Sequence, residues 1–340
     1  MARSHLTLAA LATSAVPGLD IVKAAPFGTA THNDYDSALI TDRAGKHLII
    51  RVPRTQRAET ELSADVVALR ALSAGVRTRL PFAVSTFVGE APVTVGKDPE
   101  GRTRRTRAMV YEFVYGSKVA LGNIDGPQAA SVGRAIAAIH SLPTSFVTDA
   151  GLPSLTPVEC LRACSSIIDR AAATGLAPGG LLARWESGAE ETKLWQFQPT
   201  VVNGSLTANS FLMSDGEVSG VLGWQDLHVG DPARDLFWLL GARGEQIAES
   251  GFDAYNDIRG SADRQVRQRA MLYAELEIAK WLLHGTDTKN TEIVDDAVQM
   301  LHRLLDNVRN DFMNPISPLT MPTLAVHEVE AMLEKNHRTV

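Results

Sequence analysis

The chain changes character once along its length, and this change limits the folds open to it. In roughly the first third, short β-branched and aromatic runs alternate with turn residues, which predicts an antiparallel sheet. One long helical pattern interrupts the strands over residues 58–74, where Leu62, Val66 and Leu69 recur at helical spacing. From residue 127 onwards the patterns are mainly helical. The sequence therefore predicts an α+β fold with a β-rich lobe and a mainly helical lobe.

The domain boundaries follow from the same change. We expect a β-rich N-lobe over residues 1–113, a helical C-lobe over 114–312 and a tail over 313–340. A chain of 340 residues is long enough to form two lobes with a buried core. The tail contains three prolines, and we interpret it as an appendage.

Individual elements are expected as follows. A small, apolar run at the N-terminus resembles a short signal-peptide core, but it is rich in Ala and Thr and ends at Pro17-Gly18, so we favour a first helix over 6–16. Strands are expected over 19–22, 37–41, 47–52, 82–88, 92–95 and 108–113, with a polar loop over 96–107. Helices are expected over 129–140, 156–174, 178–193, 244–257, 261–284, 291–311 and 326–335, with a short β interruption over 200–224.

Composition excludes some classes of function. The formal net charge of -6 argues against a nucleic-acid partner, because phosphate contacts require clustered Lys and Arg. The sequence contains no apolar run long enough to cross a bilayer, so no membrane span is expected. Cys160 and Cys164 are the only cysteines, which excludes a disulfide framework and suits a reducing cytoplasm. A small-molecule ligand remains possible, and a protein partner is left open.

Several segments together resemble the aminoglycoside and macrolide phosphotransferases, a family with a kinase-like fold. The most specific is the run Gly-Asp-Pro-Ala-Arg-Asp-Leu at 230–236, which follows Gly-Val-Leu-Gly-Trp at 220–224. The resemblance covers roughly residues 20–310 and also rests on the segments 48–54, 110–116 and 129–143. It implies a two-lobed kinase-like fold and transfer of phosphate from ATP or GTP with Mg²⁺ to a small-molecule hydroxyl.

The same resemblance shows which catalytic residues are missing. The family's catalytic loop reads approximately H-G-D-x-x-x-x-N, and the matching stretch here runs from Asn203 to Ser210. Ser205 stands at the position of the catalytic aspartate, and Ser210 at the position of a metal ligand. Gly223 stands at the position of the second metal ligand, an aspartate in the family. Serine is a poor base near neutral pH, and glycine has no side chain with which to bind a metal.

Neighbouring residues offer possible substitutes. Asn209 lies one position before Ser210 and becomes a metal ligand after a one-residue slip. Asp226 is a possible metal ligand three residues after Gly223, although an odd offset along a strand points it to the other face. Asp215 beside Gly216 reads as an ordinary hairpin turn.

Fewer residues match the family's nucleotide-binding positions. Gly28 and Thr29 occupy the phosphate loop, and Glu112 and Phe113 occupy the hinge that would face a purine. Arg51 stands where the family has the cation that grips phosphate. It could pair with Asp65 or Glu61 on the following helix, or remain an ordinary surface cation, and both readings stay open.

Outside these positions, Asp231 and Asp235 are expected to brace the C-lobe through backbone hydrogen bonds, and His140 to be a packed helix residue.

Three functions remain open. The altered residues favour a pseudokinase that binds a small molecule or a nucleotide, with any ATP or GTP binding weak and nearly independent of Mg²⁺. The family resemblance favours an active small-molecule O-phosphotransferase with atypical catalytic residues. A non-catalytic protein-interaction module is the third possibility, and the appended tail is its only support.

Overall fold

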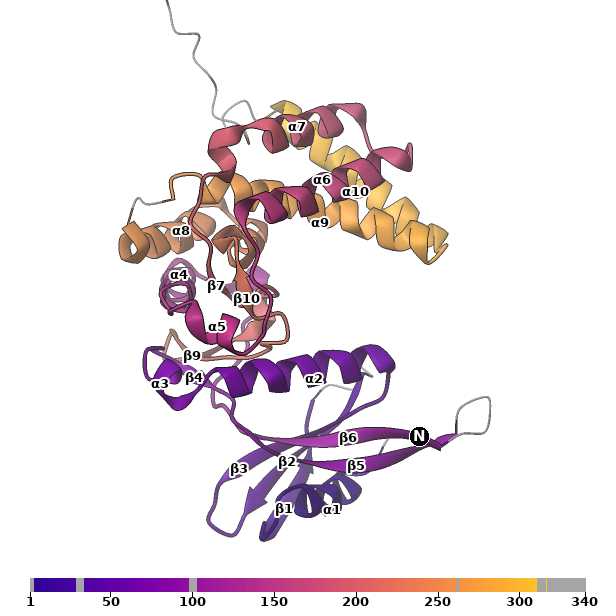
Figure 1. Ribbon diagram of the computed structural model, residues 1–340, viewed down its shortest axis with the longest axis vertical. Helices are drawn as coiled ribbons and strands as arrows, with labels where there is room; N and C mark the ends of the chain where they lie inside the picture. Colours follow the sequence, from indigo (N-terminus) through magenta and orange to yellow (C-terminus); the bar gives the residue numbers. More distant parts are fainter. Residues whose placement is uncertain (1–2, 29–33, 98–102, 261–262, 311–315, 317–340) are drawn as a thin grey trace, which may run out of the picture.

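The molecule consists of two lobes, shown in Figure 1 with the N-terminal lobe below and the helical lobe above. This is a computed structural model, which describes residues 3–28, 34–97, 103–260, 263–310 and residue 316. The α+β class and the division into a β-rich and a helical lobe, both predicted above, are confirmed.

The N-lobe is built on one five-stranded antiparallel sheet with the strand order β1-β2-β3-β6-β5. Its strands are β1 (Ile21–Pro26), β2 (Tyr35–Asp42), β3 (His47–Pro53), β5 (Phe87–Lys97) and β6 (Thr103–Glu112). Alternate residues of β2, among them Ile40, are buried, whereas β3 is buried at five of its seven residues, among them Ile50.

One helix covers each face of this sheet. On one face lies α1 (His5–Ala15), whose Leu8 and Ala12 share a buried cluster with Ile40. On the other face lies α2 (Gln56–Ala71), which Figure 1 shows between the sheet and the C-lobe. The side chain of Thr55 caps α2 by accepting a hydrogen bond from the Ala58 N–H. Helix α2 is therefore the N-lobe element that faces the other lobe.

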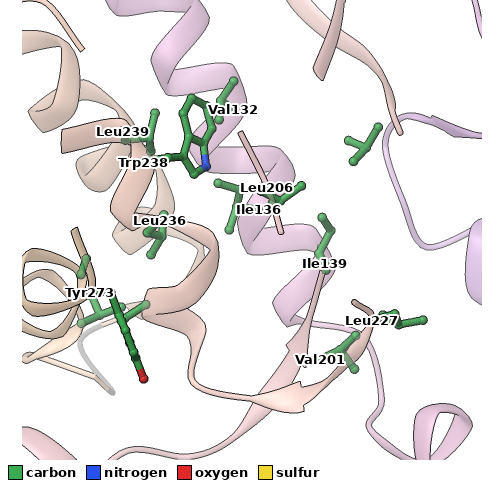
Figure 2. Close-up of a cluster of buried hydrophobic side chains, with 14 of the residues drawn as sticks. Val132, Ile136, Ile139, Val201, Leu206, Leu227, Leu236, Trp238, Leu239 and Tyr273 are labelled. Atoms are coloured by element: carbon green, nitrogen blue, oxygen red, sulfur yellow. The ribbon is translucent and has the colours of Figure 1, made fainter. Parts of the chain in front are cut away.

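The C-lobe is mainly helical, and its helices surround a small irregular β region. Its longer helices are α4 (Gly126–His140), α6 (Pro157–Ala173), α7 (Gly179–Glu190), α8 (Glu245–Arg259), α9 (Val266–Asp287) and α10 (Thr291–Asn310). Figure 2 shows Ile136 of α4 beside Leu206, in a cluster of buried side chains that also includes Ile139, Leu227 and Leu236. This core holds the segments on either side of Ser205 and Gly223 in fixed positions.

The β region of the C-lobe positions the candidate site. Strands β8 (Phe211–Ser214) and β9 (Glu217–Val221) form a hairpin, and β4 (Ala83–Val84) adds to β9 in parallel. Strands β7 (Thr200–Val202) and β10 (His228–Gly230) form a separate pair.

Three expectations about individual elements were wrong. The two strands expected over 82–88 and 92–95 are instead the two-residue β4 and the continuous β5. The expected loop over 96–107 is shorter, because β5 runs to Lys97 and β6 begins at Thr103. The expected β segment at 220–224 ends at Val221, so Gly223 and Trp224 lie in the turn that follows.

The expected helix over 326–335 lies outside the described residues. Ile316 is described and is buried against the C-lobe core beside Gly188.

Candidate functional site

Two cavities lie on either side of the segment from Gly223 to Asp226. The smaller has a volume of about 250 Å³ and lies between the lobes. The larger, of about 830 Å³, lies within the C-lobe and reaches Ala64 of α2. Five residues expected on the nucleotide side or at the metal positions line the smaller cavity: Arg51, Asp65, Glu112, Phe113 and Gly223. Ser205 and Asp226 line the larger one.

The hinge forms one wall of the smaller cavity, and part of its hydrogen-bonding capacity is already used. The N–H of Glu112 donates to the Thr86 carbonyl, and the N–H of Phe113 donates to the His47 carbonyl. The main-chain N–H and C=O of Val114 have no hydrogen-bond partner among the described residues. Val114 is thus the hinge residue whose main chain is available to a purine edge.

The phosphate-loop position of this cavity is only partly described. Phe27 lines the cavity and packs edge-on against Phe113 at 6.0 Å between ring centroids. Gly28 follows it with φ of 97°, and Thr29 lies outside the described residues.

Arg51 forms an ion pair with neither of the carboxylates expected to hold it. Glu61 accepts hydrogen bonds from Arg57 at 2.8 Å and from the Tyr35 hydroxyl at 3.4 Å. Asp65 accepts a 2.8 Å hydrogen bond from the N–H of Trp224, which joins α2 to the C-lobe. Burial raises the pKa of Asp65, and the hydrogen bond from Trp224 and the charge of Arg51 only partly offset this.

The hydrogen bond between Asp65 and Trp224 leads to a prediction about stability. Asp65→Ala should lower the free energy of unfolding by about 1–3 kcal/mol, because the buried Trp224 N–H loses its acceptor. Asp65→Asn keeps an acceptor oxygen and should stay within about 1 kcal/mol of the wild type. Urea denaturation at pH 7 measures both, and equal losses in the two variants would contradict this account.

The pH dependence follows from the raised pKa of Asp65. The folded protein holds the Asp65 proton more tightly than the unfolded chain does, so this carboxyl makes the protein less stable as pH rises through its folded pKa. Asparagine has no charge to desolvate. The stability of Asp65→Asn relative to wild type should therefore increase between acid and neutral pH.

The catalytic-loop positions form a network of neutral side chains. The Asn203 Oδ1 accepts hydrogen bonds from the N–H of Ser205 at 3.3 Å and from its hydroxyl at 3.4 Å. The Gln225 amide donates to the Ser205 hydroxyl at 3.0 Å, and the Asn203 amide donates to the Gly223 carbonyl at 2.8 Å. These side chains hold one another and carry no negative charge where the family has its aspartates.

The residues present do not fit a magnesium ion. Mg²⁺ in phosphate-transfer sites is held through carboxylates, and Gly223 offers none while Ser210 contributes only a neutral hydroxyl. Gly223 also has φ of 75°, a left-handed conformation in which a side chain is strained. No group of three or more His, Cys, Asp or Glu side chains could hold a metal ion in the described part of the chain.

In the described part of the chain, no hydrogen bond joins Asn209, Asp215 or Asp226 to Ser205 or Gly223. Asn209 is exposed, and the Ser210 hydroxyl accepts a 3.2 Å hydrogen bond from the Thr207 N–H. Asp215 has φ of 52° in the turn between β8 and β9. Asp226 is exposed on the wall of the larger cavity, where the chain turns after β9.

Asp235 holds the backbone of the catalytic loop. Its two carboxylate oxygens accept hydrogen bonds from the N–H groups of Asn203 and Gly204, each at 2.7 Å. The buried imidazole of His140 lies 3.2 Å from the same carboxylate and 3.0 Å from the Tyr255 hydroxyl. Asp235 and His140 are both fully buried, so this group fixes the position of the loop and does not face a ligand.

Asp231 forms a second buried brace beside the larger cavity. It forms a 2.8 Å ion pair with Arg269, and both side chains are inaccessible to solvent. The Tyr273 hydroxyl and the Ala233 N–H also donate to Asp231. Arg269 additionally donates to the Leu194 carbonyl and to Asp263, so it joins three segments of the C-lobe.

Sequence reasoning missed most of the larger cavity. One wall is apolar and includes both cysteines, which the sequence predicted only as buried apolar residues; its residues include Leu152, Leu155, Cys160, Ala163, Cys164 and Ile167. Burial raises the pKa of the Cys160 thiol to about 11 and that of Cys164 to about 12.

Glu277 also lines this cavity, and it forms ion pairs with Arg234 at 3.1 Å and with Lys280 at 2.5 Å. In the sequence, these residues were marked only by the spacing of three between Glu277 and Lys280 on α9 (Val266–Asp287). Oppositely charged pairs at this spacing are common on solvated helices, so it did not indicate a cavity.

The chain is similar to known phosphotransferases in sequence and in structure. A family model described as "Phosphotransferase enzyme family" matches residues 26–304. The macrolide 2'-phosphotransferase MphH from Brachybacterium faecium is 19% identical, with a TM-score of 0.66 over 88% of this chain and 98% of that chain. A type I macrolide 2'-phosphotransferase is 22% identical over the same shares, also with a TM-score of 0.66.

The GDP complex of aminoglycoside 2'-phosphotransferase-IIIa is 16% identical, with a TM-score of 0.67 over 90% of this chain and 100% of that chain. No curated protein matches the sequence. In the described part of the chain, no helix is both long and apolar enough to cross a membrane.

Proposed function

The chain belongs to the phosphotransferase enzyme family, and we propose that within this family it acts as a pseudokinase, which binds a nucleotide or another small molecule and transfers little or no phosphate. The observation that carries this proposal is the neutral network at the boundary of the two cavities. Asn203, Ser205 and Gln225 bond to one another there, and Gly223 is in a left-handed conformation. Phosphate transfer requires a carboxylate beside the attacking hydroxyl and carboxylates on the metal, and these positions provide neither.

The expected loss in the rate of phosphate transfer is large, which supports the proposal. Loss of a positioned general base alone costs about a hundred- to ten-thousand-fold in rate. The loss of the metal carboxylates adds to this, because the charge of a transferring phosphate is then left without a cation held by the protein. Both cavities are nevertheless present, at about 250 and 830 Å³, so the missing groups do not remove the space for a ligand.

One observation favours an active O-phosphotransferase as the second candidate. Asp226 lines the same cavity as Ser205 and is exposed, so its carboxylate faces an acceptor hydroxyl if a ligand occupies that cavity. Under this candidate, the unaltered protein phosphorylates a macrolide or an aminoglycoside, and Asp226→Asn abolishes the activity.

The test of this proposal is a variant in which the missing catalytic and metal-binding side chains are all put back at once. We expect the wild type to show no hydrolysis or transfer from ATP or GTP above background. The variant Ser205→Asp, Ser210→Asn, Gly223→Asp should gain Mg²⁺-dependent nucleotide binding and slow hydrolysis, because these groups act as a unit. Coupled phosphate-release assays and calorimetry measure the two properties.

The matched control carries Ser205→Asp, Ser210→Asn and Gly223→Ala. It puts the same strain on the left-handed backbone at Gly223 without adding the carboxylate. Clear phosphorylation of a macrolide or an aminoglycoside by the wild type would refute the pseudokinase and favour the Asp226 candidate.

A further inference from the structure

We infer that the larger cavity, within the C-lobe, binds an apolar carboxylic acid, whose carboxylate is held by Arg234 and Lys280 and whose apolar body packs against the apolar wall described above. This inference rests on the proposed function and deepens it, because it names the chemical class of the bound small molecule. Arg234 lies within the run at 230–236 without a role predicted for it, and Lys280 lies outside every motif.

The first support is that the guanidinium of Arg234 has hydrogen-bond donors to spare. An arginine side chain carries several N–H groups in one planar fork. In the described part of the chain, the only hydrogen bond that the Arg234 side chain makes is to Glu277, at 3.1 Å. Arg234 lines the cavity, and none of its nitrogen atoms is among the buried polar atoms that lack a partner. Its remaining N–H groups are therefore accessible and can donate to a ligand.

The second support is that this guanidinium is held in one orientation. It lies over the rings of Phe237 and Tyr273, at 5.4 and 5.0 Å from the ring centroids. Tyr273 is itself fixed, because its hydroxyl donates to the buried Asp231. A planar fork that is oriented before the ligand arrives matches the two oxygens of a carboxylate and loses little freedom on binding.

The third support is that two cations share one carboxylate oxygen. Arg234 and Lys280 both donate to Oε1 of Glu277. Burial would raise the pKa of Glu277, but the hydrogen bonds and charges of Lys280 and Arg234 outweigh it, and the pKa is lowered. Glu277 is therefore ionised at neutral pH, and the cluster has two positive charges against one negative charge. A ligand carboxylate balances this cluster.

Two other carboxylates line the cavity, and neither serves these cations. Asp231 forms its ion pair with Arg269, at 2.8 Å. Asp226 is exposed and directly follows Gln225, which bonds to Ser205. In the part of the chain that the structure describes, neither carboxylate forms a hydrogen bond or an ion pair with the two cations. The negative charge of Asp226 directs a ligand carboxylate away from the Ser205 side of the cavity.

The fourth support is that the apolar wall adjoins the cations. Most of this wall comes from α6 and the segment before it. Burial raises the pKa of the Cys164 thiol and the charge of Arg234 lowers it in part, so the guanidinium lies close to the wall. The volume of about 830 Å³ is within the range of small-molecule sites. A ligand with its carboxylate at Arg234 can therefore bury an apolar body along α6.

Fluorescence titration with three dansyl probes tests the inference. Dansylaminoundecanoic acid, its primary amide and the corresponding amine share one apolar body and differ in the charge of the end group. Full-length protein is titrated into each probe near neutral pH, and the dansyl emission reports burial. We expect the acid to bind with a Kd on the order of 10⁻⁵ M, about tenfold more tightly than the amide, and the amine to bind least tightly.

Three variants test the cations. Arg234→Met and Lys280→Met should each weaken binding of the acid about tenfold and leave the amide unchanged, because only the acid uses their charge. Glu277→Gln should tighten binding of the acid about threefold, because both cations lose their internal counter-charge. A cluster with only a structural role would give no such gain in affinity.

Two further variants locate the apolar body and control for the substitutions. Ile167→Ala shortens a side chain of the apolar wall, so it should weaken the acid and the amide equally, each by about fivefold. Arg162→Met removes an exposed arginine of α6 that does not line the cavity, and it should leave both Kd values unchanged.

The inference is wrong if the amide or the amine binds as tightly as the acid, if Glu277→Gln weakens the acid, or if Arg234→Met weakens the acid and the amide equally. Absence of binding by all three probes would also overturn it, but would leave the pseudokinase proposal standing. Phosphate transfer by the wild type would refute that proposal whatever the larger cavity binds.

Discussion

Replacing Asp235 with alanine should lower the free energy of unfolding by about 3–5 kcal/mol, the range for removing one partner from a buried charged network. The Asp235 carboxylate accepts the N–H groups of Asn203 and Gly204 and contacts the His140 imidazole, all in the solvent-excluded core. After truncation these donors have no acceptor, and water cannot reach them without opening the C-lobe. Urea denaturation followed by circular dichroism measures the loss.

The matched control for this experiment is Asp253→Ala. Asp253 is an exposed aspartate on α8, and its removal should change stability by less than about 0.5 kcal/mol. Asp235→Asn keeps the size of the side chain but directs an N–H₂ group at a backbone N–H, so it should rescue little. If Asp235→Asn were as stable as the wild type, the carboxylate could not be the acceptor that holds the catalytic loop.

Arg269→Met should cost a similar amount, about 3–5 kcal/mol, because it leaves the carboxylate of Asp231 buried without its ion-pair partner. Methionine approximates the length of the arginine stem, so most of the packing against the Phe197 ring, 4.3 Å from the guanidinium, is preserved. The loss measured by urea denaturation therefore reports mainly on charge and hydrogen bonds.

A second substitution separates the effect of the stranded charge from the loss of contacts. Asp231→Asn combined with Arg269→Met should be more stable than Arg269→Met alone, since the amide is neutral and can still accept from Tyr273. Arg264→Met, on an exposed arginine nearby, serves as the control and should be close to neutral. Equal stability of the single and double variants would show that the charge of Asp231 is not what makes the loss large.

The sequence predicted the order of lobes and most elements, but it misplaced boundaries where long-range pairing decides them. The sequence predicted two strands here, over 82–88 and 92–95, with a break just before Pro92. In the structure β5 continues through Pro92, and it can do so because β5 is the edge strand of its sheet. Similarly, α4 begins before the expected Ala129, because Asp125 and Gln128 form a capping box around Gly126 and Pro127.

In the candidate site too, the sequence predicted what depends on neighbouring residues and missed what depends on contacts between distant segments. The resemblance to the family's motifs predicted roles for Ser205, Ser210 and Gly223, because such motifs are matched by local register. It could not reveal that Asp65 bonds to Trp224, because the two lie 159 residues apart in the chain. Nor could it place Arg234 and Lys280 in the cavity that Ser205 lines, since that arrangement depends on how the segments of the C-lobe pack.

The left-handed backbone at Gly223 also bears on how the protein evolves. With φ of 75°, this position disfavours every residue that carries a Cβ, at a cost of about 1–3 kcal/mol. A lineage that once had an aspartate here would, by reverting, first lose stability and gain no activity, because Ser205 and Ser210 would still be uncorrected. Selection would remove such an intermediate before the other two changes arose. Under the proposed function, the glycine at residue 223 therefore makes a return to catalysis harder than its further loss.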